Sequence, residues 1–402
     1  MATKTTKSRM RETDKTSRYP ALCIIGDGNA RLWGRMLGER LKKQFSEAGV
    51  GRFIVVSQAA YEDGTVIFVR GDAIIDQPLI AVLVREKGLV LTGEGTGGTI
   101  ALAAHVTPEQ GGRIRALLTR GGMPDTDLDL TARGPGELGA NFRKSLRKRE
   151  MPYAMTVSSA DRATIEWRMF MGTYKGATDF VTKYIWPWPA FMVTRWLATR
   201  RVTPNMVTTV GAILMVAAFF LFLKGVWAEG LTCAWAMTFL DTVDGKLARV
   251  TLTSSKWGDI FDHGIDLIHP PFWYMAWGFG LEHGGFILPS GAMVWLLVVI
   301  FAGYILQRLM EGVAIKVLRL NIHIWRRIDS MFRQVTARRN PNLVLLTVSA
   351  LVARPDWGVE AVALWTGLCL ILHGLQLIQA LGEKRRKGAL SSWLDQATSS
   401  RS

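Results

Sequence analysis

The second half of the chain is dominated by long apolar runs, which predict a bundle of membrane-spanning helices. A helix needs about 20 mainly apolar residues to cross a bilayer. Apolar runs follow one another here with polar breaks between them, and the fifth run is short. We expect six spans, at residues 204–224, 227–250, 258–281, 293–316, 343–352 and 359–381.

The first half shows a different pattern, in which short apolar runs alternate with amphipathic ones. The apolar runs predict buried strands at residues 21–26, 52–57, 65–71 and 88–93. The amphipathic runs predict helices at residues 32–47, 77–88 and 107–122. Strands that alternate with helices are typical of a parallel, layered α/β sheet. The predicted fold class is therefore a soluble α/β domain followed by an all-α membrane domain.

Changes in composition predict the domain boundaries. Residues 1–18 are polar and basic without an apolar core, which indicates a disordered arm rather than a secretory signal. Residues 19–160 form the α/β domain, and residues 161–202 form a connector. Aromatic, proline and basic residues are interleaved in this connector, as in a helix lying in the membrane interface. Residues 203–383 form the membrane domain, and residues 384–402 form a cytoplasmic tail.

The chain has a formal net charge of +16. A basic excess can indicate binding to nucleic acid or to a membrane surface. Much of the excess lies in the predicted loop at 319–339 and in the tail after residue 383, whereas the alternate loops contain almost no Lys or Arg. The positive-inside rule then places both termini in the cytoplasm, as expected for a bacterial-type inner membrane protein. No nucleic-acid partner is expected.

Four aspartates interrupt the apolar pattern near residue 250. Asp241 and Asp244 are three residues apart, and Asp262 and Asp266 are four apart, so each pair lies on one face of a helix. The short break between the helices predicts antiparallel neighbours with converging carboxylates. Carboxylates in or near a bilayer usually mark a functional site, and divalent metal ions are suitable counter-ions. The alternative is a pair of amphipathic helices with solvated acidic faces.

The same stretch carries the spacing D-x2-D-G-x2-A-R-x8-G-x3-D-x3-D at every fixed position. This spacing resembles the signature of the CDP-alcohol phosphotransferase family of integral membrane enzymes. The resemblance implies a CDP-alcohol donor and an alcohol or lipid acceptor, whose hydroxyl attacks the β-phosphorus and releases CMP. It also implies a homodimer in contact with membrane lipids, with two divalent ions, Mg²⁺ or Mn²⁺, in each site.

The resemblance also implies roles for individual residues. Asp241, Asp244 and Asp262 would be metal ligands. Asp266 would share a metal and accept the proton of the acceptor hydroxyl, as the catalytic base. The nucleotide-binding residues would be Gly245, Ala248, Arg249 and Gly258, together with Asn205 and Thr208 from the start of the first span. Helix capping alone would also explain the last two.

Basic residues near the predicted cytoplasmic surface have two interpretations each. Three of them are candidates for binding an acceptor phosphate: Lys183, Arg195 and Arg308. The alternative is that these long side chains only extend from the membrane interface to water. The basic run at 142–150 either forms the solvated face of a helix or contacts anionic lipid headgroups, at about 1 kcal/mol for each basic residue.

The first predicted strand ends in GDGNAR, which places Gly26, Gly28 and Arg31 in a turn before a helix. A glycine-rich turn lets a phosphate approach the backbone. This loop resembles the opening loop of sugar-phosphate nucleotidyltransferases, and Asp72 resembles the metal-binding aspartate of that family. The loop lacks the glycine-rich run of the family, and no lysine of the K-P type follows it. These departures favour a regulatory or structural relative over an active nucleotidyltransferase.

A nucleotidyltransferase-like domain fused to a CDP-alcohol phosphotransferase is known among inositol-phosphate enzymes, and the join at 161–202 looks similar. Two further functions remain open. The chain would be bifunctional if its N-terminal domain also made the CDP-alcohol from CTP. It would otherwise be a non-catalytic membrane scaffold, or a transporter whose acids bind cations. Release of CMP separates the phosphotransferase from the scaffold and the transporter.

Overall fold

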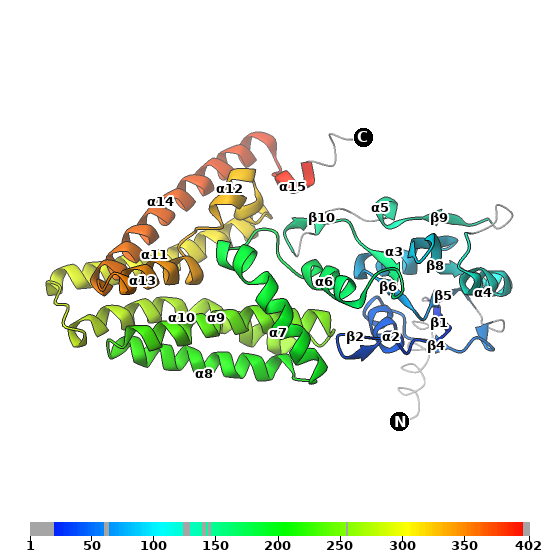
Figure 1. Cartoon of the computed structure of the whole chain (residues 1–402). Helices are drawn as coiled ribbons and strands as arrows, with labels where there is room; N and C mark the ends of the chain where they lie inside the picture. Colours follow the sequence, from blue (N-terminus) through cyan, green and yellow to red (C-terminus); the bar gives the residue numbers. More distant parts are fainter. Residues whose placement is uncertain are drawn as a thin grey trace, which may run out of the picture. The chain divides into compact units, whose positions relative to one another are not determined.

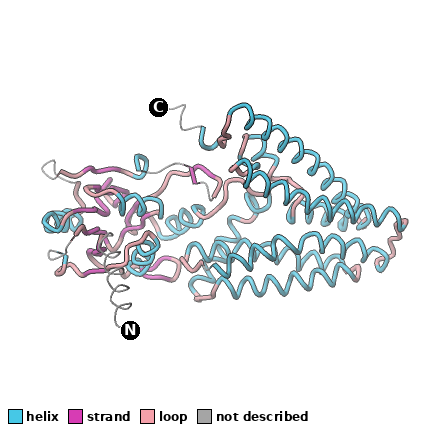
Figure 2. The backbone as a smooth tube through the Cα atoms, turned by 180° about the vertical axis from the view of Figure 1, so that it is seen from behind, coloured by secondary structure: helices cyan, strands magenta, loops and turns pink. Residues whose placement is uncertain are grey.

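The computed structural model describes residues 20–59, 64–123, 129–138, 142–143, 146–254 and 256–396, except the side chains of residues 142, 256, 257, 259–263, 290 and 396. The predicted arm at 1–18 lies outside these residues. The chain divides into two compact units. The first comprises residues 1–143 and 150–172, and the second comprises residues 144–149 and 173–402. Strands build the core of the first unit, and helices build nearly all of the second (Figure 1, Figure 2).

The first unit contains an eight-stranded sheet. Its strands are β1 (Ala21–Ile25), β4 (Phe53–Ile54), β5 (Val66–Arg70), β6 (Ala73–Ile75), β7 (Leu89–Gly95), β8 (Gly98–Val106), β9 (Thr131–Arg133) and β12 (Ala154–Thr156). The order is β4-β1-β5-β8-β7-β12-β6, and β9 pairs with β7. β1 runs parallel to β4 and β5, whereas β8 is antiparallel to both β5 and β7. The sheet is therefore mixed, and the prediction of a parallel sheet was wrong.

Two strands make the sheet mixed, since β6 is antiparallel to β12 and β8 is antiparallel to both of its neighbours. The sequence pattern did not predict β8. Alanine is a poor strand former, and three of the nine residues of β8 are alanine. The strand is nevertheless buried from Ala101 to Val106. It returns from β7 through a tight turn at Gly98, whose φ of 133° suits glycine. Burial between β5 and β7 therefore outweighs the weak local preference.

Both faces of the sheet are covered. The helices of this unit are α2 (Leu37–Glu47), α3 (Gln77–Arg85), α4 (Gly111–Arg120), α5 (Pro135–Leu138) and α6 (Arg162–Gly172), with the 3-10 turn η2 (Pro108–Gln110). Along β5, Ile67 and Val69 join a core with α2 and α3, whereas Val66 and Phe68 join a core with α4. This alternation is the two-residue period of a strand buried on both faces.

The helix predicted from residue 32 begins later, at residue 37. The preceding residues form a small ribbon of β2 (Arg31–Leu32) and β3 (Arg35–Met36). Trp33 and Gly34 form its turn, with φ angles of 52° and 74°. The Trp33 side chain is buried, so a packing anchor rather than helix periodicity fixes this segment.

The second unit is a helical bundle. Its long helices are α7 (Pro187–Thr199), α8 (Pro204–Leu223), α9 (Trp227–Val250), α10 (Lys256–His283), α11 (Ser290–Val313), α13 (Arg339–Leu351) and α14 (Pro355–Lys387). Shorter pieces are η3 (Val181–Ile185), η4 (Ala314–Leu318), η5 (Ile322–Ile324), α12 (Arg327–Phe332) and α15 (Trp393–Gln396). α8 packs against α9 and α10, and α14 packs against α11 and α13 (Figure 1).

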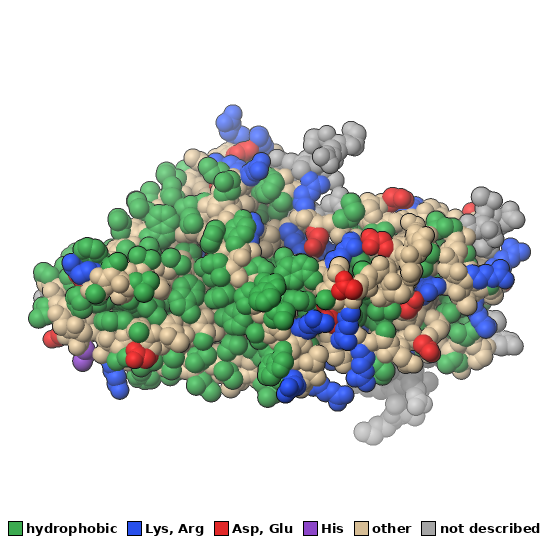
Figure 3. Space-filling model, in the orientation of Figure 1, with side chains coloured by type: hydrophobic (Ala, Val, Ile, Leu, Met, Phe, Trp, Pro, Cys, Tyr) green, Lys and Arg blue, Asp and Glu red, His purple; other side chains and the backbone are tan. Residues whose placement is uncertain are grey.

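Among the described residues of this bundle, three segments are long and apolar enough to cross a membrane: Pro204–Leu223, Gly291–Leu318 and Pro355–Lys387. Each of the six predicted spans nevertheless coincides with a helix, since α9, α10 and α13 occupy the other three stretches. α13 has only 13 residues. Hydrophobic side chains cover much of the visible surface of the bundle (Figure 3). Ile213, Trp295 and Leu364 are among the exposed large hydrophobic residues of the bundle. An apolar outer surface is expected for a protein solvated by lipid.

Two segments flanking the bundle were predicted to lie at the membrane surface. α7 exposes Trp188 and Trp196 and buries Phe191, so it is amphipathic and rich in aromatic residues. The basic run at 142–150 is not a helix in its described part, which forms β10 (Phe142–Arg143) and β11 (Lys148–Arg149). Its interpretation as a helix face was therefore wrong.

The turn after β1 is tightly packed, which yields a test of the fold. A Cβ atom added at Gly28 would lie 2.7 Å from the Cα of Gly38. We expect Gly28→Ala to destabilise the first unit by about 1–3 kcal/mol, because backbone atoms cannot move aside as a flexible side chain would. The measurement is the apparent melting temperature of the purified full chain.

Gly112→Ala is the matched control, because a Cβ atom there would meet nothing within 4 Å and the residue lies in α4. We expect this control to leave the melting temperature unchanged or to raise it. Equal melting temperatures for the two variants would contradict the packing account of the turn.

Candidate active site

Three of the four predicted aspartates have described side chains, and they lie on two neighbouring helices. Asp241 and Asp244 lie on α9, and Asp266 lies on α10. The residue Asp244 is 3% exposed, whereas the side chains of Asp241 and Asp266 are 15% and 40% exposed. Asp262 also lies on α10, but its side chain is outside the described part.

A single guanidinium joins the two helices. Arg339, the first residue of α13, donates from Nη2 to Asp241 Oδ2 at 2.5 Å. Its Nη1 donates to Asp266 Oδ1. The carboxylates of Asp241 on α9 and Asp266 on α10 therefore converge on one cation, the guanidinium of Arg339. Arg339 entered the sequence analysis only as a loop charge, because it is 98 residues from Asp241.

The third carboxylate is held from another helix. Thr208 on α8 donates from Oγ1 to Asp244 Oδ2 at 2.6 Å. Asp244 Oδ1 is buried and accepts no hydrogen bond in the described part of the structure. An orphaned carboxylate oxygen in a buried position is unfavourable unless a further cation or donor arrives. Capping of α8 is performed by Thr203, whose Oγ1 accepts from the N–H of Met206.

These acids border a cavity of about 390 Å³ in the second unit. Eight basic and four acidic side chains line it, including Asp241, Asp266 and Arg249 from the motif. Gly245 also lines the cavity, and a Cβ atom there would have only Arg249 Nη1 within 4 Å, at 3.9 Å. Packing within the protein therefore does not require glycine at position 245. The space beside Gly245 is open to a molecule bound in the cavity.

The remaining nucleotide candidates lie elsewhere. Asn205 is exposed in the first turn of α8, and neither Asn205 nor Thr208 is among the residues lining the cavity. Ala248 and Gly258 are half-buried and do not line it either. Thr208 reaches the site indirectly, through its hydrogen bond to Asp244.

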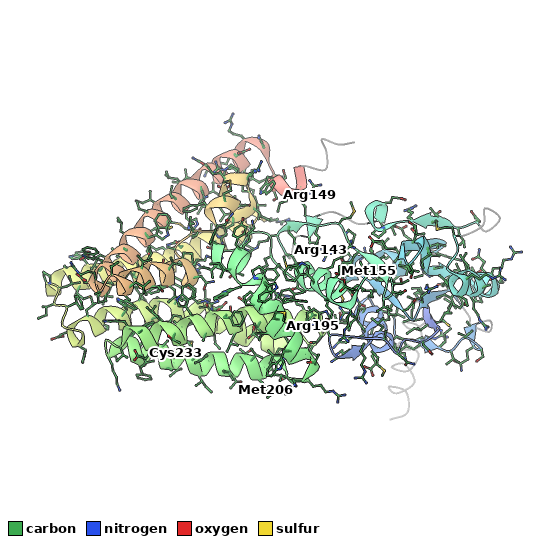
Figure 4. The ribbon with its side chains drawn as sticks, viewed as in Figure 1. Arg143, Arg149, Met155, Arg195, Met206 and Cys233 are labelled. Carbon is green, nitrogen blue, oxygen red and sulfur yellow. The ribbon has the colours of Figure 1, made fainter. Side chains whose placement is uncertain are left out.

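The three acceptor candidates are placed differently. Arg308 lines the cavity, where it pairs with Glu311 Oε2 at 3.2 Å. Lys183 and Arg195 do not line it. The ammonium of Lys183 lies over the ring of Tyr184, 5.2 Å from its centroid. Arg195 projects from α7 (Figure 4).

The cavity contains basic residues that sequence reasoning did not select. They are Arg147, Lys175, Lys246, Arg333, Arg338 and Arg339. Lys246 lies within the motif but is buried against Tyr174, with its Nζ 3.7 Å from the ring centroid. Arg147 and Lys175 precede the membrane half of the chain, where no motif marks them.

The N-terminal candidates form a tight turn in the first unit. A Cβ atom at Gly71 would lie 2.9 Å from the backbone nitrogen of Gly28, so the β1 turn packs directly on the end of β5. Arg31 lies in β2. Asp72 accepts from Arg70 at both carboxylate oxygens, at 2.9 Å from Nε and 2.8 Å from Nη2. Such a bidentate pair occupies the oxygens that a metal would need.

Metal coordination normally needs several ligating side chains close together. Within the described residues, no group of three or more His, Cys, Asp or Glu side chains is close enough to form a ready-made metal site. The donor chemistry at α9 and α10 nevertheless suits a hard divalent cation, because carboxylate oxygens converge and one buried oxygen of Asp244 is orphaned.

Comparison with known proteins shows that part of the second half of the chain matches a protein family. Residues 201–373 match the family described as CDP-alcohol phosphatidyltransferase. The cholinephosphotransferase 1 of Danio rerio is 31% identical over 98 residues, which cover 22% of this chain and 24% of that protein. The phosphatidylinositol phosphate synthase of Streptomyces avermitilis is 30% identical over 95 residues, which cover 23% and 37%.

A third relative is the archaetidylinositol phosphate synthase of Pyrococcus horikoshii, which is 34% identical over 79 residues, or 19% of this chain and 42% of that protein. The chain thus spans less than half the length of each of these relatives. The C-terminal part of the chain carries a CDP-alcohol phosphatidyltransferase family domain. The matched residues include Asp241, Asp244 and Asp266 and exclude Arg147 and Lys175.

The shared guanidinium gives a testable energetic claim. Arg339→Ala leaves two partly buried carboxylates without their cation, and breaking such a pair costs about 3–5 kcal/mol. We expect a large drop in the apparent melting temperature of the purified protein in chelator-containing buffer. A second substitution, Asp266→Asn, should lower the melting temperature less in the Arg339→Ala variant than in the native protein, because the two residues interact.

The control is Arg327→Ala, since Arg327 is exposed on the short helix α12. It should leave the melting temperature nearly unchanged. If the changes in melting temperature caused by Arg339→Ala and Asp266→Asn are strictly additive, the interaction between Arg339 and Asp266 does not contribute to stability.

Proposed function

We propose that this chain is a membrane phosphotransferase that moves a phospho-alcohol group from a CDP-alcohol to an acceptor hydroxyl. The hydroxyl oxygen forms a bond to the β-phosphorus, the bond from that phosphorus to the bridging oxygen breaks, and CMP leaves. The proton of the hydroxyl passes to a carboxylate. The observation that supports this most strongly is the convergence of acids from α9 and α10 beside a cavity that also presents Arg249 and Gly245.

Divalent cations are part of this proposal. We assign Asp241, Asp244, Asp262 and Asp266 as the ligands of two ions, Mg²⁺ or Mn²⁺. The orphaned oxygen of Asp244 and the shared cation of Asp241 and Asp266 both fit an environment built to neutralise carboxylates. The ions would neutralise the diphosphate of the donor. Arg339 then completes the charge balance from α13.

Asp266 is the proposed base. A base must reach the hydroxyl of the acceptor within hydrogen-bonding distance. Asp266 lines the cavity, and its side chain is the most exposed of the three described carboxylates. Tyr304 Oη donates to the carbonyl oxygen of Leu267 at 2.9 Å, which helps to fix this turn of α10.

The donor side of the cavity is assigned to the motif. Gly245 leaves space for the nucleotide, and Arg249 supplies a phosphate-binding cation without an ion-pair partner among the described residues. Thr208 contributes by fixing Asp244. We retain Asn205, Ala248 and Gly258 as proposed contacts that the bound nucleotide would reach.

The membrane arrangement is likewise a proposal. Six spans would comprise α8, α9, α10, α11, α13 and α14, with α7 in the interface and both termini in the cytoplasm. The exposed apolar residues of α8, α11 and α14 support burial of these helices in lipid. A homodimer remains a prediction from the family resemblance.

The first unit is proposed as a structural or regulatory nucleotidyltransferase-like domain. Asp72 is engaged by Arg70, which argues against a metal-binding role. The bifunctional alternative predicts that the full chain releases pyrophosphate from CTP and a phosphorylated alcohol. We expect no pyrophosphate above background in a coupled assay. Release that Asp72→Asn abolishes would establish the bifunctional enzyme instead.

The proposed reaction is tested with purified protein, Mg²⁺ or Mn²⁺ and a panel of CDP-alcohols and acceptors, following CMP. We expect Asp266→Asn to lower kcat at least 100-fold while nucleotide binding is retained, because the proton acceptor is lost whereas Asp241, Asp244 and Asp262 would still hold the ions that bind the donor. Glu282→Gln, an exposed change on the same helix, is the control and should be fully active. Absence of CMP release with every pair of substrates would favour a scaffold or transporter.

The space beside Gly245 gives a separate test. Gly245→Ala should weaken binding of CMP or a CDP-alcohol about 10-fold or more, because the added methyl group enters the cavity. The melting temperature should not fall, because the methyl group meets no described protein atom closer than 3.9 Å. Gly312→Ala on α11 is the matched control, since a Cβ atom there meets nothing within 4 Å. Unchanged nucleotide affinity in Gly245→Ala would remove this residue from the donor site.

A further inference from the structure

The basic residues of the cavity fall into two groups. In the first group, positive charge is already compensated: Arg339 pairs with Asp241 and Asp266, and both Arg308 and Arg338 pair with Glu311. Within the described part of the second unit, the second group has no ion-pair partner. Its members are Arg147, Lys175, Arg249 and Arg333. Lys246 also lacks an ion pair there, but its ammonium lies over the ring of Tyr174 and donates to the carbonyl oxygen of Thr173 at 3.4 Å.

Arg333 shows most directly that something is missing from this second group. The residue is 9% exposed, and its Nε and Nη1 atoms are buried without a hydrogen-bond acceptor among the described residues. Buried N–H groups of a guanidinium normally have partners, because leaving them unpaired costs the full desolvation penalty. An anion entering the cavity would supply acceptors to these groups.

Arg147 is held in place by its backbone. The carbonyl oxygen of Leu146 accepts from the N–H of Gly176 at 2.8 Å, and a Cβ atom at Gly176 would lie 2.6 Å from that of Lys148. Arg147 itself has φ of 50°, in the left-handed region that side chains other than glycine rarely adopt. Such strain persists where the surroundings impose it, and it is frequent at ligand-binding positions.

The unpaired charges are also close enough to affect one another. Burial is the main cause that lowers the pKa of Lys175, and repulsion from Arg249 and Arg147 lowers it further. Attraction to Asp266 and Asp241 opposes this shift but is smaller. Burial lowers the pKa of Arg147 as well, followed by repulsion from Arg338. Crowded cations of this kind are stabilised by an anion that contacts several of them at once.

We propose that Arg147, Lys175 and Arg333 bind a second anionic group, distinct from the donor diphosphate, carried by the acceptor as a phosphate monoester or a group of equivalent charge. The proposal rests on the proposed function, which assigns Arg249 to the donor. Arg147 and Lys175 lie outside the matched residues 201–373, so the preceding part of the chain would select the acceptor. A neutral acceptor would leave this charge uncompensated.

The test uses the full chain in nanodiscs of neutral lipid, with saturating CMP to occupy the donor side, and titrates inorganic phosphate calorimetrically. We expect Arg147→Ala and Lys175→Ala each to weaken phosphate binding at least 10-fold. Arg147→Lys should recover part of the affinity, which a purely structural role would not produce. The matched control is Arg149→Ala on the same segment (Figure 4), because Arg149 does not line the cavity.

Equal phosphate affinity in the native protein, Arg147→Ala and Lys175→Ala would overturn the proposal, provided that melting temperatures show all three folded. Failure of the enzyme assignment looks different. In that case phosphate still binds through Arg147, but no CDP-alcohol releases CMP. Conversely, if the protein releases CMP while Arg147→Ala leaves the phosphate affinity unchanged, the phosphotransferase assignment stands and the proposed phosphate subsite is wrong.

A second arm identifies the source of the anionic group. Phosphatidic acid is added to the nanodiscs, and the phosphate titration is repeated. Displacement of inorganic phosphate by the lipid, lost in Arg147→Ala, supports a lipid headgroup as the ligand. Unchanged phosphate affinity in the lipid-containing discs supports a water-soluble phosphorylated alcohol.

Discussion

The second unit depends on neutralising carboxylates that have been removed from water. Asp241 and Asp266 share the guanidinium of Arg339, and Asp244 is held by Thr208. These contacts tie α9 and α10 to α13 and α8. An isolated charge in such a place would be strongly unfavourable, so the four helices have to meet at one point. The cavity lies beside this point.

The same requirement explains how charge is distributed within the cavity. The charge of Arg339 is compensated by Asp241 and Asp266. The charges of Arg308 and Arg338 are compensated by Glu311. Arg147, Lys175, Arg249 and Arg333 retain unmatched charge in the described structure. A protein that binds only cations would not need this excess, whereas a donor and an acceptor that both carry phosphate would use it. The arrangement therefore fits group transfer between anionic substrates better than cation transport.

Much of this could be predicted from the sequence, because the signals are local. Apolar runs located the helices α8, α9, α10, α11, α13 and α14, and the aspartate spacing located the acids. The partner residues could not be predicted, because Arg339 is 98 residues from Asp241 and Arg147 lies in the other half of the chain. The alanine-rich strand β8 was missed for a related reason, since its burial between β5 and β7 is decided by tertiary packing. Sequence patterns identify which groups need a partner, and the fold decides which residue supplies it.

The most direct test of the central claim is a crystal structure of the protein soaked with Mn²⁺ and a CDP-alcohol, with the ions located by anomalous scattering. The account predicts peaks bound by the carboxylates of Asp241, Asp244 and Asp266, with the diphosphate next to them and near Arg249. Peaks elsewhere, or a diphosphate bound away from these carboxylates, would contradict it.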